Sequence, residues 1–283
     1  MPEGPGAAVS SLSAVGGIGA VSLSWDLPPE WIMAVLSRYA VGTTPPVDPT
    51  SGTLLHYGFG TTASVSGLKP GTDYAFSVWA NGGPASAVVS GTTIAMSVAP
   101  GAVAYGAPVT STATVTDATT RAALPGRTAT IYWRVVGSTT WDVLRSATTD
   151  ANGQVSAVSS PRYDVQYEAV ASGGVGRMGA VTSVGTVPVS YFIPSRLSTL
   201  APALGQTVIW SGSLLPLRVG HPVYLQDRYH AAWHTIATVL VPTTGRFALA
   251  IRPPARGVFG YRLFTPADAY NAAGAVQVVI TVH

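Results

Sequence analysis

Alternation of apolar and polar residues, without a sustained helical period, most constrains how this 283-residue chain folds. The stretch AVSLSW places Val21, Leu23 and Trp25 on one face, and YAFSVWA, ATIYWR and FALAI alternate in the same way. A period of two is typical of antiparallel strands with one buried face. Turn signals such as LPP, KPG, NGG and DANG recur at the spacing of roughly ten residues that is common in β-sandwiches. We therefore expect an all-β chain.

Composition supports a folded chain that does not depend on disulfides. Charged residues make up 10% of the sequence and hydrophobic residues 47%, whereas disordered segments combine low hydrophobicity with high charge. There is no cysteine, so stability must come from the cores. The length suits two or three domains.

An internal repeat indicates that two of the domains are related. GRTATIYWR, at residues 126–134, matches GHPVYLQDR, at residues 220–228, and a tryptophan follows each copy, Trp141 and Trp233. Each copy continues through a glycine turn, a strand and a segment that begins with tyrosine. Two homologous sandwiches of similar length explain this pattern, and the preceding residues form a third of another subtype.

The sequence thus predicts three domains, at residues 1–95, 96–189 and 190–283. The segments at the joints, TIAMSVAP and VPVSYFIPS, contain apolar residues and proline without a Gly-Ser run. Linkers of this composition are stiffer than Gly-Ser linkers. We expect three tandem β-sandwiches in a semi-rigid rod.

Residues 1–95 carry the pattern VSLSWDLP, YAVG, VSGLKPGTDYAFSVWA and VSGTT. In this pattern they resemble a fibronectin type III domain. Trp25 stands where that family buries a strand-B tryptophan, and Leu68, Pro70, Thr72 and Tyr74 match its L-x-P-x-T-x-Y run. The resemblance implies that the Tyr74 hydroxyl bonds back to the backbone as a tyrosine corner.

The rest of the chain resembles bacterial immunoglobulin-like sandwiches of the kind found in secreted actinobacterial and phage virion proteins. Residues 191–283 carry LGQTVIWSGSLLP, VGHPVYLQDRYHAAWHTIATVLV, TGRFALAI and GVFGYRLFTPA, and residues 96–190 look like a more diverged copy. These residues build a fold and specify no ligand.

No motif in the sequence predicts catalysis, a cofactor site or a metal site. His230 and His234 fall in a hairpin and lack the third ligand that zinc needs. The DANG stretch, residues 150–153, lacks the remaining ligands of a calcium loop and suits a turn. Asp164 and Glu168 are the only close pair of acids that suggests a glycosidase, and a solvated strand face explains them better. Serine-nucleophile, phosphate-loop and dinucleotide motifs are absent.

Aromatic residues are the remaining candidates for contact with a partner, since they stack on sugars or become buried at protein interfaces. Trp25, Trp133 and Trp210 suit the cores, and several of the other aromatics fall in loops or on outer faces. The segment that contains Trp31 and Met33 is either a hydrophobic plug or an exposed contact. The candidate interaction surface comprises Trp31, Met33, Trp141, Trp233 and Tyr270.

Charge is distributed unevenly along the chain. The net charge is −3 over residues 1–95, +1 over 96–190 and +5 over 191–283. An acidic head and a basic tail suit head-to-tail stacking, or contact between the tail and an anionic surface, although chance also produces such imbalance when charges are few. Basic residues form no run, which argues against nucleic-acid binding. No apolar stretch is long enough for a membrane helix.

These observations predict a non-catalytic structural or adhesion protein whose partners are other protein subunits, with a cell-surface glycan as a further candidate. Lys69 is the only lysine, against fourteen arginines, which is typical of a GC-rich genome. The favoured interpretation is a virion component, in a phage tail or on a capsid, of an actinobacterial host. The alternatives are a secreted actinobacterial surface, filament or adhesin protein, and a carbohydrate-binding accessory module of a hydrolase. MPEGPG is not a secretory leader, so a natural start at Met1 favours the virion, whereas a removed leader favours the alternatives.

Overall fold

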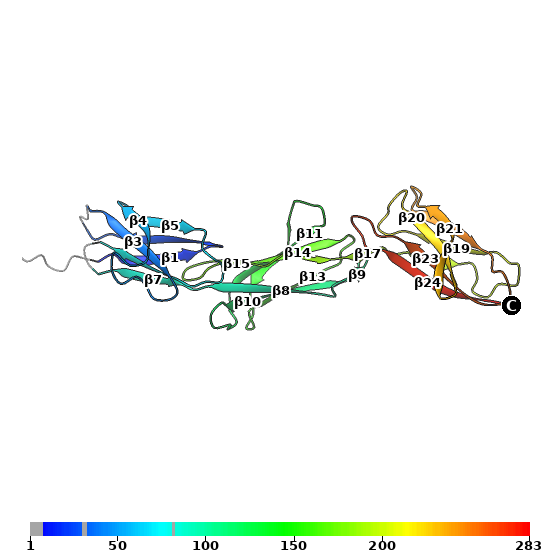
Figure 1. Cartoon of the computed structure of the whole chain (residues 1–283), viewed down its shortest axis with the longest axis horizontal. Coiled ribbons are helices and arrows are strands. Elements are labelled where there is room, and N and C mark those ends of the chain that lie inside the picture. Colours follow the sequence, from blue (N-terminus) through cyan, green and yellow to red (C-terminus); the bar gives the residue numbers. More distant parts are fainter. Residues whose placement is uncertain (1–7, 30–32, 81–82) are drawn as a thin grey trace, which may run out of the picture.

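The computed structural model describes residues 8–29, 33–80 and 83–283, and these residues form strands and turns without a helix. The strands group into three β-sandwiches that follow one another along a single long axis (Figure 1). The C-terminus lies at the end of the rod opposite the first sandwich. The fold is therefore three tandem immunoglobulin-like or fibronectin type III sandwiches, as the alternation and the motif resemblance together predict.

The strands of the first sandwich are β1 (Ser10–Gly16), β2 (Ala20–Asp26), β3 (Val35–Val41), β4 (Thr53–Gly58), β5 (Thr62–Ser66), β6 (Tyr74–Trp79) and β7 (Ala85–Val89). Those of the second are β8 (Thr92–Ala99), β9 (Val103–Ala104), β10 (Val109–Asp117), β11 (Thr128–Val135), β12 (Asp142–Thr148), β13 (Gln154–Ser159), β14 (Val165–Ala171), β15 (Ala180–Val181) and β16 (Gly185–Val187). After β17 (Val189–Ser190), the third contains β18 (Ser195–Leu197), β19 (Val208–Ser213), β20 (Pro222–Tyr229), β21 (Ala232–Leu240), β22 (Arg246–Ile251), β23 (Gly257–Thr265) and β24 (Gly274–Val282).

All three sandwiches share one strand order. A three-strand sheet, β1-β2-β5, faces a four-strand sheet, β4-β3-β6-β7, in the first. The same arrangement recurs as β8-β10-β13 with β12-β11-β14-β15, and as β18-β19-β22 with β21-β20-β23-β24. In the second sandwich the last strand is interrupted, since both β15 and β16 pair with β14. The first sandwich, expected to be a different subtype, thus has the same topology as the repeated pair.

Alternation correctly predicts which side chains form the cores. Val21, Leu23 and Trp25 are buried in the first sandwich, and Trp210 is buried in the third. The tyrosine corner is present, because the backbone N–H of Lys69 donates to the Tyr74 hydroxyl at 2.9 Å.

Strand β6 is buried on both faces. Besides the core-facing side chains, Ala75 and Ser77 on the opposite face are inaccessible to solvent, and Trp79 is nearly so. The loop before β4 covers this face, since the Ser77 hydroxyl donates to the Pro46 carbonyl at 2.8 Å.

The segments expected to be linkers belong to the sandwiches. TIAMSVAP lies mostly in β8, which pairs with β10 along its full length and runs across the predicted boundary at residue 95. Its alternating Ile94, Met96 and Val98 turn toward the second core. In VPVSYFIPS, β17 pairs in parallel with β9, and Tyr191 and Ile193 join the third core. Apolar residues at every second position make these segments strands rather than spacers.

Candidate functional site

The predicted surface residues that the structure describes are distributed along the rod and form no common patch. Met33 is 61% exposed on the first sandwich, and Tyr270 is 43% exposed beside the second joint. Trp141 and Trp233 are half-buried, on the second and third sandwiches. Trp31 lies outside the described residues. That these residues contact a partner remains a prediction.

Arginines cover one face of both repeated tryptophans. The guanidinium carbon of Arg134 lies 4.3 Å from the ring centroid of Trp141, and that of Arg262 lies 4.5 Å from the centroid of Trp233. Both guanidinium groups also hydrogen-bond to a glutamine side chain, Gln166 or Gln226. The two tryptophans follow the repeat, but the arginines come from different strands, Arg134 from β11 and Arg262 from β23. Each contact leaves less of its ring available for stacking on a sugar.

The most exposed aromatic side chains lie on the first sandwich. Tyr57 and Phe59 are 73% and 75% exposed, and Leu54 nearby is also exposed. They lie on or just after β4, which pairs only with β3 and so forms an edge of its sheet. Because Val35 pairs with Gly58, Met33 lies at the same end of this sheet as Phe59. Alternation within TLLHYGFG does not predict these positions, because the β3–β4 pairing shifts register at Leu55, which packs against the core.

The candidate catalytic and metal-binding residues occupy structural positions. His230 and Ala231 form the two-residue turn between β20 and β21. Asp150 accepts hydrogen bonds from the backbone N–H groups of Asn152 and Gln154, as a turn aspartate does. Across the described residues, no group of three or more histidine, cysteine, aspartate or glutamate side chains is placed to hold a metal ion. No helix in this part of the chain is long and apolar enough to cross a membrane.

Asp164 has a structural role at the second joint. It precedes β14, and its carboxylate accepts a 2.6 Å hydrogen bond from the Val189 N–H. The Asp164 carboxylate is therefore engaged in a hydrogen bond at the second joint, where the chain enters the third sandwich.

The first joint is built by a loop of the second sandwich that reaches into the first. Residues 172–179, here called the inserted loop, connect β14 to β15. Five backbone hydrogen bonds of 2.9–3.0 Å attach it to the ends of β1 and β7. They join Gly16 to Gly174, Ala14 to Gly176, Gly17 to Gly179, and Ser90 to both Gly176 and Met178.

Met178 anchors the inserted loop in the first core. Its side chain is fully buried among residues of the first sandwich, which include Ala14, Val21 and Val89. Glycine is needed where the two backbones meet, because a Cβ at Gly173 would overlap the carbonyl oxygen of Gly16. The core of the first sandwich is therefore completed by a residue that follows it by nearly ninety positions.

Side chains reinforce this joint. Asp117 at the end of β10 forms an ion pair with Arg177 of the inserted loop. The backbone N–H of Thr120 and the Arg177 guanidinium hold the pKa of Asp117 well below its ordinary value. Asp73 accepts hydrogen bonds from the Gly91 N–H at 2.6 Å and from the Thr119 hydroxyl at 2.8 Å. An ion pair and hydrogen bonds thus link the two sandwiches across this joint.

The second joint is also hydrogen-bonded from both sides. The buried Asn271 amide donates to the carbonyls of Arg162 and Val189 at 3.0 and 3.1 Å. The Asp164 N–H donates to the Tyr270 carbonyl at 2.7 Å. The Arg218 guanidinium lies 4.5 Å from the Tyr270 ring centroid. Tyr270 therefore contributes to the joint as well as to the surface.

Asp268 orders the loop that carries these contacts. Its carboxylate accepts from the Tyr191 hydroxyl at 2.7 Å and from the backbone N–H groups of Tyr270 and Asn271 at 2.8 Å. Burial opposes ionisation of Asp268, but these hydrogen bonds outweigh it and keep its pKa below the ordinary value. Burial, followed by the hydrogen bond to Asp268, raises the pKa of Tyr191. A hydroxyl and two backbone N–H donors therefore hold the loop.

Comparison with known proteins gives structural matches alone. No protein-family profile matches the chain, and no curated protein matches it. Similar solved structures include the chicken CNTN1 FN1-FN3 domains, 12% identical with a TM-score of 0.22, covering 98% of this chain and 100% of that one. The tetra-tandem repeat in the extending region of a large adhesion protein is 15% identical with a TM-score of 0.32, covering 93% and 70%. The ICAM-5 D1-D4 ectodomain fragment is 10% identical with a TM-score of 0.34, covering 95% and 73%. The assignment of the fold therefore rests on strand order and pairing.

Proposed function

We propose that the chain is a non-catalytic structural and adhesion protein, a rigid rod that holds an interaction surface at a fixed distance from its attachment point. The observation that carries this proposal is the construction of the two joints. Each is bridged by backbone hydrogen bonds from loops of neighbouring sandwiches, and the first is also plugged by Met178. A flexible tether does not need hydrogen bonds across its joints, whereas a rigid spacer needs them to hold its domains in place.

The exposed aromatics at the far end of the first sandwich suit a protein contact. Tyr57, Phe59 and Met33 present apolar surface beside the unpaired edge of β4. Sheet edges and exposed aromatics are common means of protein recognition. Partner subunits in a lattice or fibre are therefore the proposed ligands.

A carbohydrate-binding accessory module is the less favoured interpretation. Trp141 and Trp233 each have an arginine over one ring face, and Tyr270 has Arg218 within 4.5 Å. The three rings also belong to different parts of the rod. They do not form the row of free aromatic faces that a polysaccharide needs.

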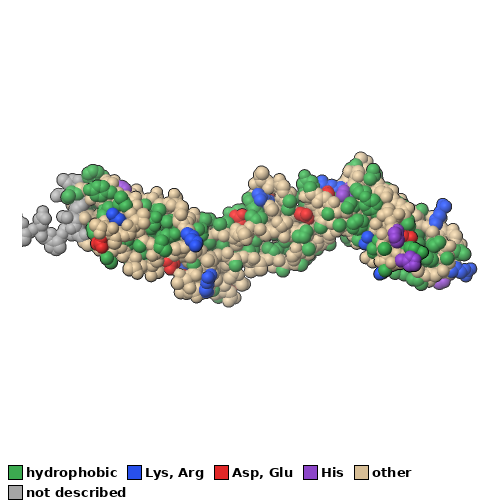
Figure 2. Space-filling view, in the orientation of Figure 1, with side chains coloured by type: hydrophobic (Ala, Val, Ile, Leu, Met, Phe, Trp, Pro, Cys, Tyr) green, Lys and Arg blue, Asp and Glu red, His purple; other side chains and the backbone are tan. Residues whose placement is uncertain are grey.

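Two settings suit this role, a virion of a phage with an actinobacterial host and the surface of such a bacterium. The low lysine content favours a GC-rich genome in both cases. Neighbouring tail or capsid genes would support the virion, and a longer reading frame with a leader would support the cell surface. Sparse, scattered charge on the visible face of the rod suits either setting (Figure 2).

The test is light scattering of the purified chain over a wide range of concentration, combined with a pull-down on insoluble cell-wall glycan. The proposal expects growth into oligomers or fibres and no retention on the glycan. A chain that remains monomeric at every concentration and is retained on the glycan contradicts the proposal and supports the accessory module.

A further inference from the structure

The inference concerns the seam, defined as the gap between the first strand of the three-strand sheet and the last strand of the four-strand sheet in each sandwich. In the first sandwich the seam lies between β1 and β7, and the inserted loop hydrogen-bonds to the ends of both strands. Met178 fills the space behind it. An extended segment with one apolar side chain thus closes this seam.

In the third sandwich a segment of the chain covers the end of the strand on one side of the seam. Residues 200–204 lead from β18 to β19 and lie against the end of β24. The Thr281 N–H donates to the Leu200 carbonyl at 3.0 Å, and the His283 N–H donates to the Pro202 carbonyl at 3.1 Å. The Leu204 N–H donates to the His283 carbonyl at 3.0 Å.

The seam of the second sandwich is open. It is a groove of about 530 Å³ between β8 and the segment that contains β15 and β16. Strand β8 pairs with β10 alone, so its other edge has unpaired backbone groups among the described residues. The opposite wall is irregular because the last strand is interrupted between Val181 and Gly185.

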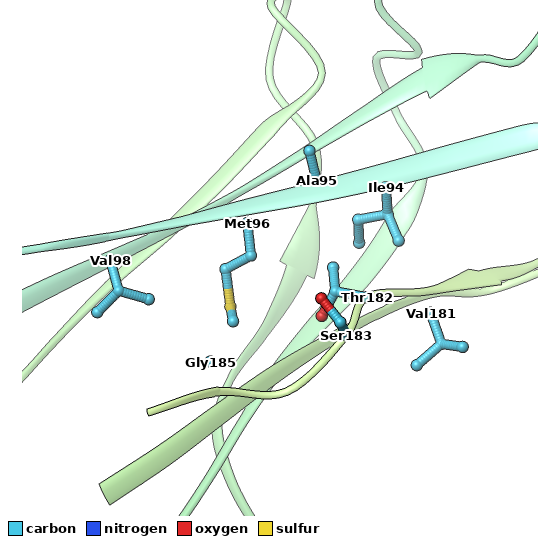
Figure 3. Close-up of a pocket in the computed structure, with 8 residues that line it drawn as sticks. All are labelled: Ile94, Ala95, Met96, Val98, Val181, Thr182, Ser183 and Gly185. Atoms are coloured by element: carbon cyan, nitrogen blue, oxygen red, sulfur yellow. The ribbon is translucent and has the colours of Figure 1, made fainter. Parts of the chain in front are cut away.

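The open seam exposes side chains that belong to the core. Ile94, Met96 and Val98 extend from β8 toward the opposite wall, and Ala95 points away (Figure 3). The first three pack against the core clusters of the second sandwich but are only half-buried. Opposite them, Val181 is 42% exposed. The β8 side of the groove is therefore apolar, Thr182 and Ser183 line the opposite side, and the rims are strand edges, a combination that suits an added strand.

The groove also continues from the first joint. The inserted loop leads directly into β15, and β8 begins next to Gly91, whose N–H is bonded to Asp73. We propose that the seam of the second sandwich binds an extended segment of a separate protein chain. The segment carries one unbranched apolar side chain between glycines or other small residues, the chemistry by which the inserted loop fills the first seam. This adds a docking site to the proposed rod.

The experiment uses the full chain and a synthetic peptide, SGGVGRMG, that copies the inserted loop. A second peptide with aspartate in place of methionine is the control. Hydrogen exchange measured by mass spectrometry follows the amides of β8. The first seam is already filled by its own loop at high effective concentration, so the peptide added in trans has access to the second seam. Protection of residues 94–98 by the methionine peptide alone is the expected result.

A pair of glycine variants tests the location. Gly185 lines the groove without positive φ, and a Cβ there meets nothing within 4 Å, so Gly185→Leu fills the groove without backbone strain. Gly101 lies outside the groove, and it too lacks positive φ and has nothing within 4 Å of an added Cβ. Gly101→Leu is therefore the matched control. We expect Gly185→Leu to weaken peptide binding at least about tenfold and Gly101→Leu to leave it unchanged.

Three results would overturn the proposal. The first is that residues 94–98 are not protected at millimolar peptide, and the second is that they are protected equally in Gly185→Leu. The third is that protection of β8 rises with protein concentration in the absence of peptide, which would assign the seam to a second copy of the chain. Exchange at residues 14–17 and at Ser90 shows whether the first joint stays intact. A failed peptide experiment with that joint intact removes the docking site and leaves the proposed rod standing.

Discussion

Replacement of Met178 by alanine tests whether the inserted loop completes the first core. The side chain is fully buried there, although the residue lies far along the chain in the second sandwich. Met→Ala at buried sites costs about 2–5 kcal/mol through lost transfer free energy and the cavity left behind. The cost cannot exceed the free energy with which the inserted loop docks, because the loop undocks once the cost reaches that value. A loss of about 2–4 kcal/mol is a large part of the stability of one domain.

The assay is hydrogen exchange at increasing urea, read separately on peptides from each sandwich. We expect Met178→Ala to lower the unfolding free energy of the first sandwich, with that of the third unchanged. Met33→Ala is the matched control, since Met33 is 61% exposed and its loss should cost less than about 0.5 kcal/mol. Destabilisation confined to the second sandwich would refute the reasoning, as would an effect equal to that of Met33→Ala.

Other predictions follow from the joints and from one turn. Gly173→Ala forces its Cβ against the Gly16 carbonyl, so we expect undocking of the inserted loop, visible as faster exchange at Ser90; unchanged exchange there would count against the steric argument. The pKa of Asp117 lies below its ordinary value of 3.8 in the folded chain, so its stabilising effect is present above about pH 4 and is lost as the pH falls toward the lowered value. Asp117→Asn should reduce this loss of stability in an acid titration, and an identical titration in the variant would contradict the assignment. His230 and Ala231 both have positive φ, at 47° and 64°, in a two-residue hairpin turn. His230→Asn with Ala231→Gly should stabilise the third sandwich by about 1 kcal/mol, measured as a rise in its melting temperature; a fall would refute the turn assignment.

Local patterns in the sequence predicted the sandwiches and their cores. Alternation located Val21, Leu23 and Trp25, and the spacing of the L-x-P-x-T-x-Y run predicted the hydrogen bond of Tyr74. Both signals arise from contacts within one strand or between neighbouring segments, which a single sequence encodes directly.

Such local patterns did not predict how the sandwiches are joined. The segment GGVGRM has the composition of a turn, and nothing in its period shows that Met178 enters another domain. The interruption between β15 and β16 was equally hidden, because TSVG resembles an ordinary turn. Arg134 and Arg262 were counted as charges, whereas the fold stacks them on tryptophans. In each case long-range packing decides a role that local propensity leaves open.

The most direct test of the rigid rod is the distribution of distances between pairs of spin labels across each joint. The chain has no cysteine, so labels attach only where cysteine is introduced. Ser64 with Val158 reports on the first joint and Val158 with Ala248 on the second, since all three positions are exposed. A pair within one sandwich is the control. The account predicts distributions across both joints about as narrow as the control, and broad distributions across either joint would contradict it.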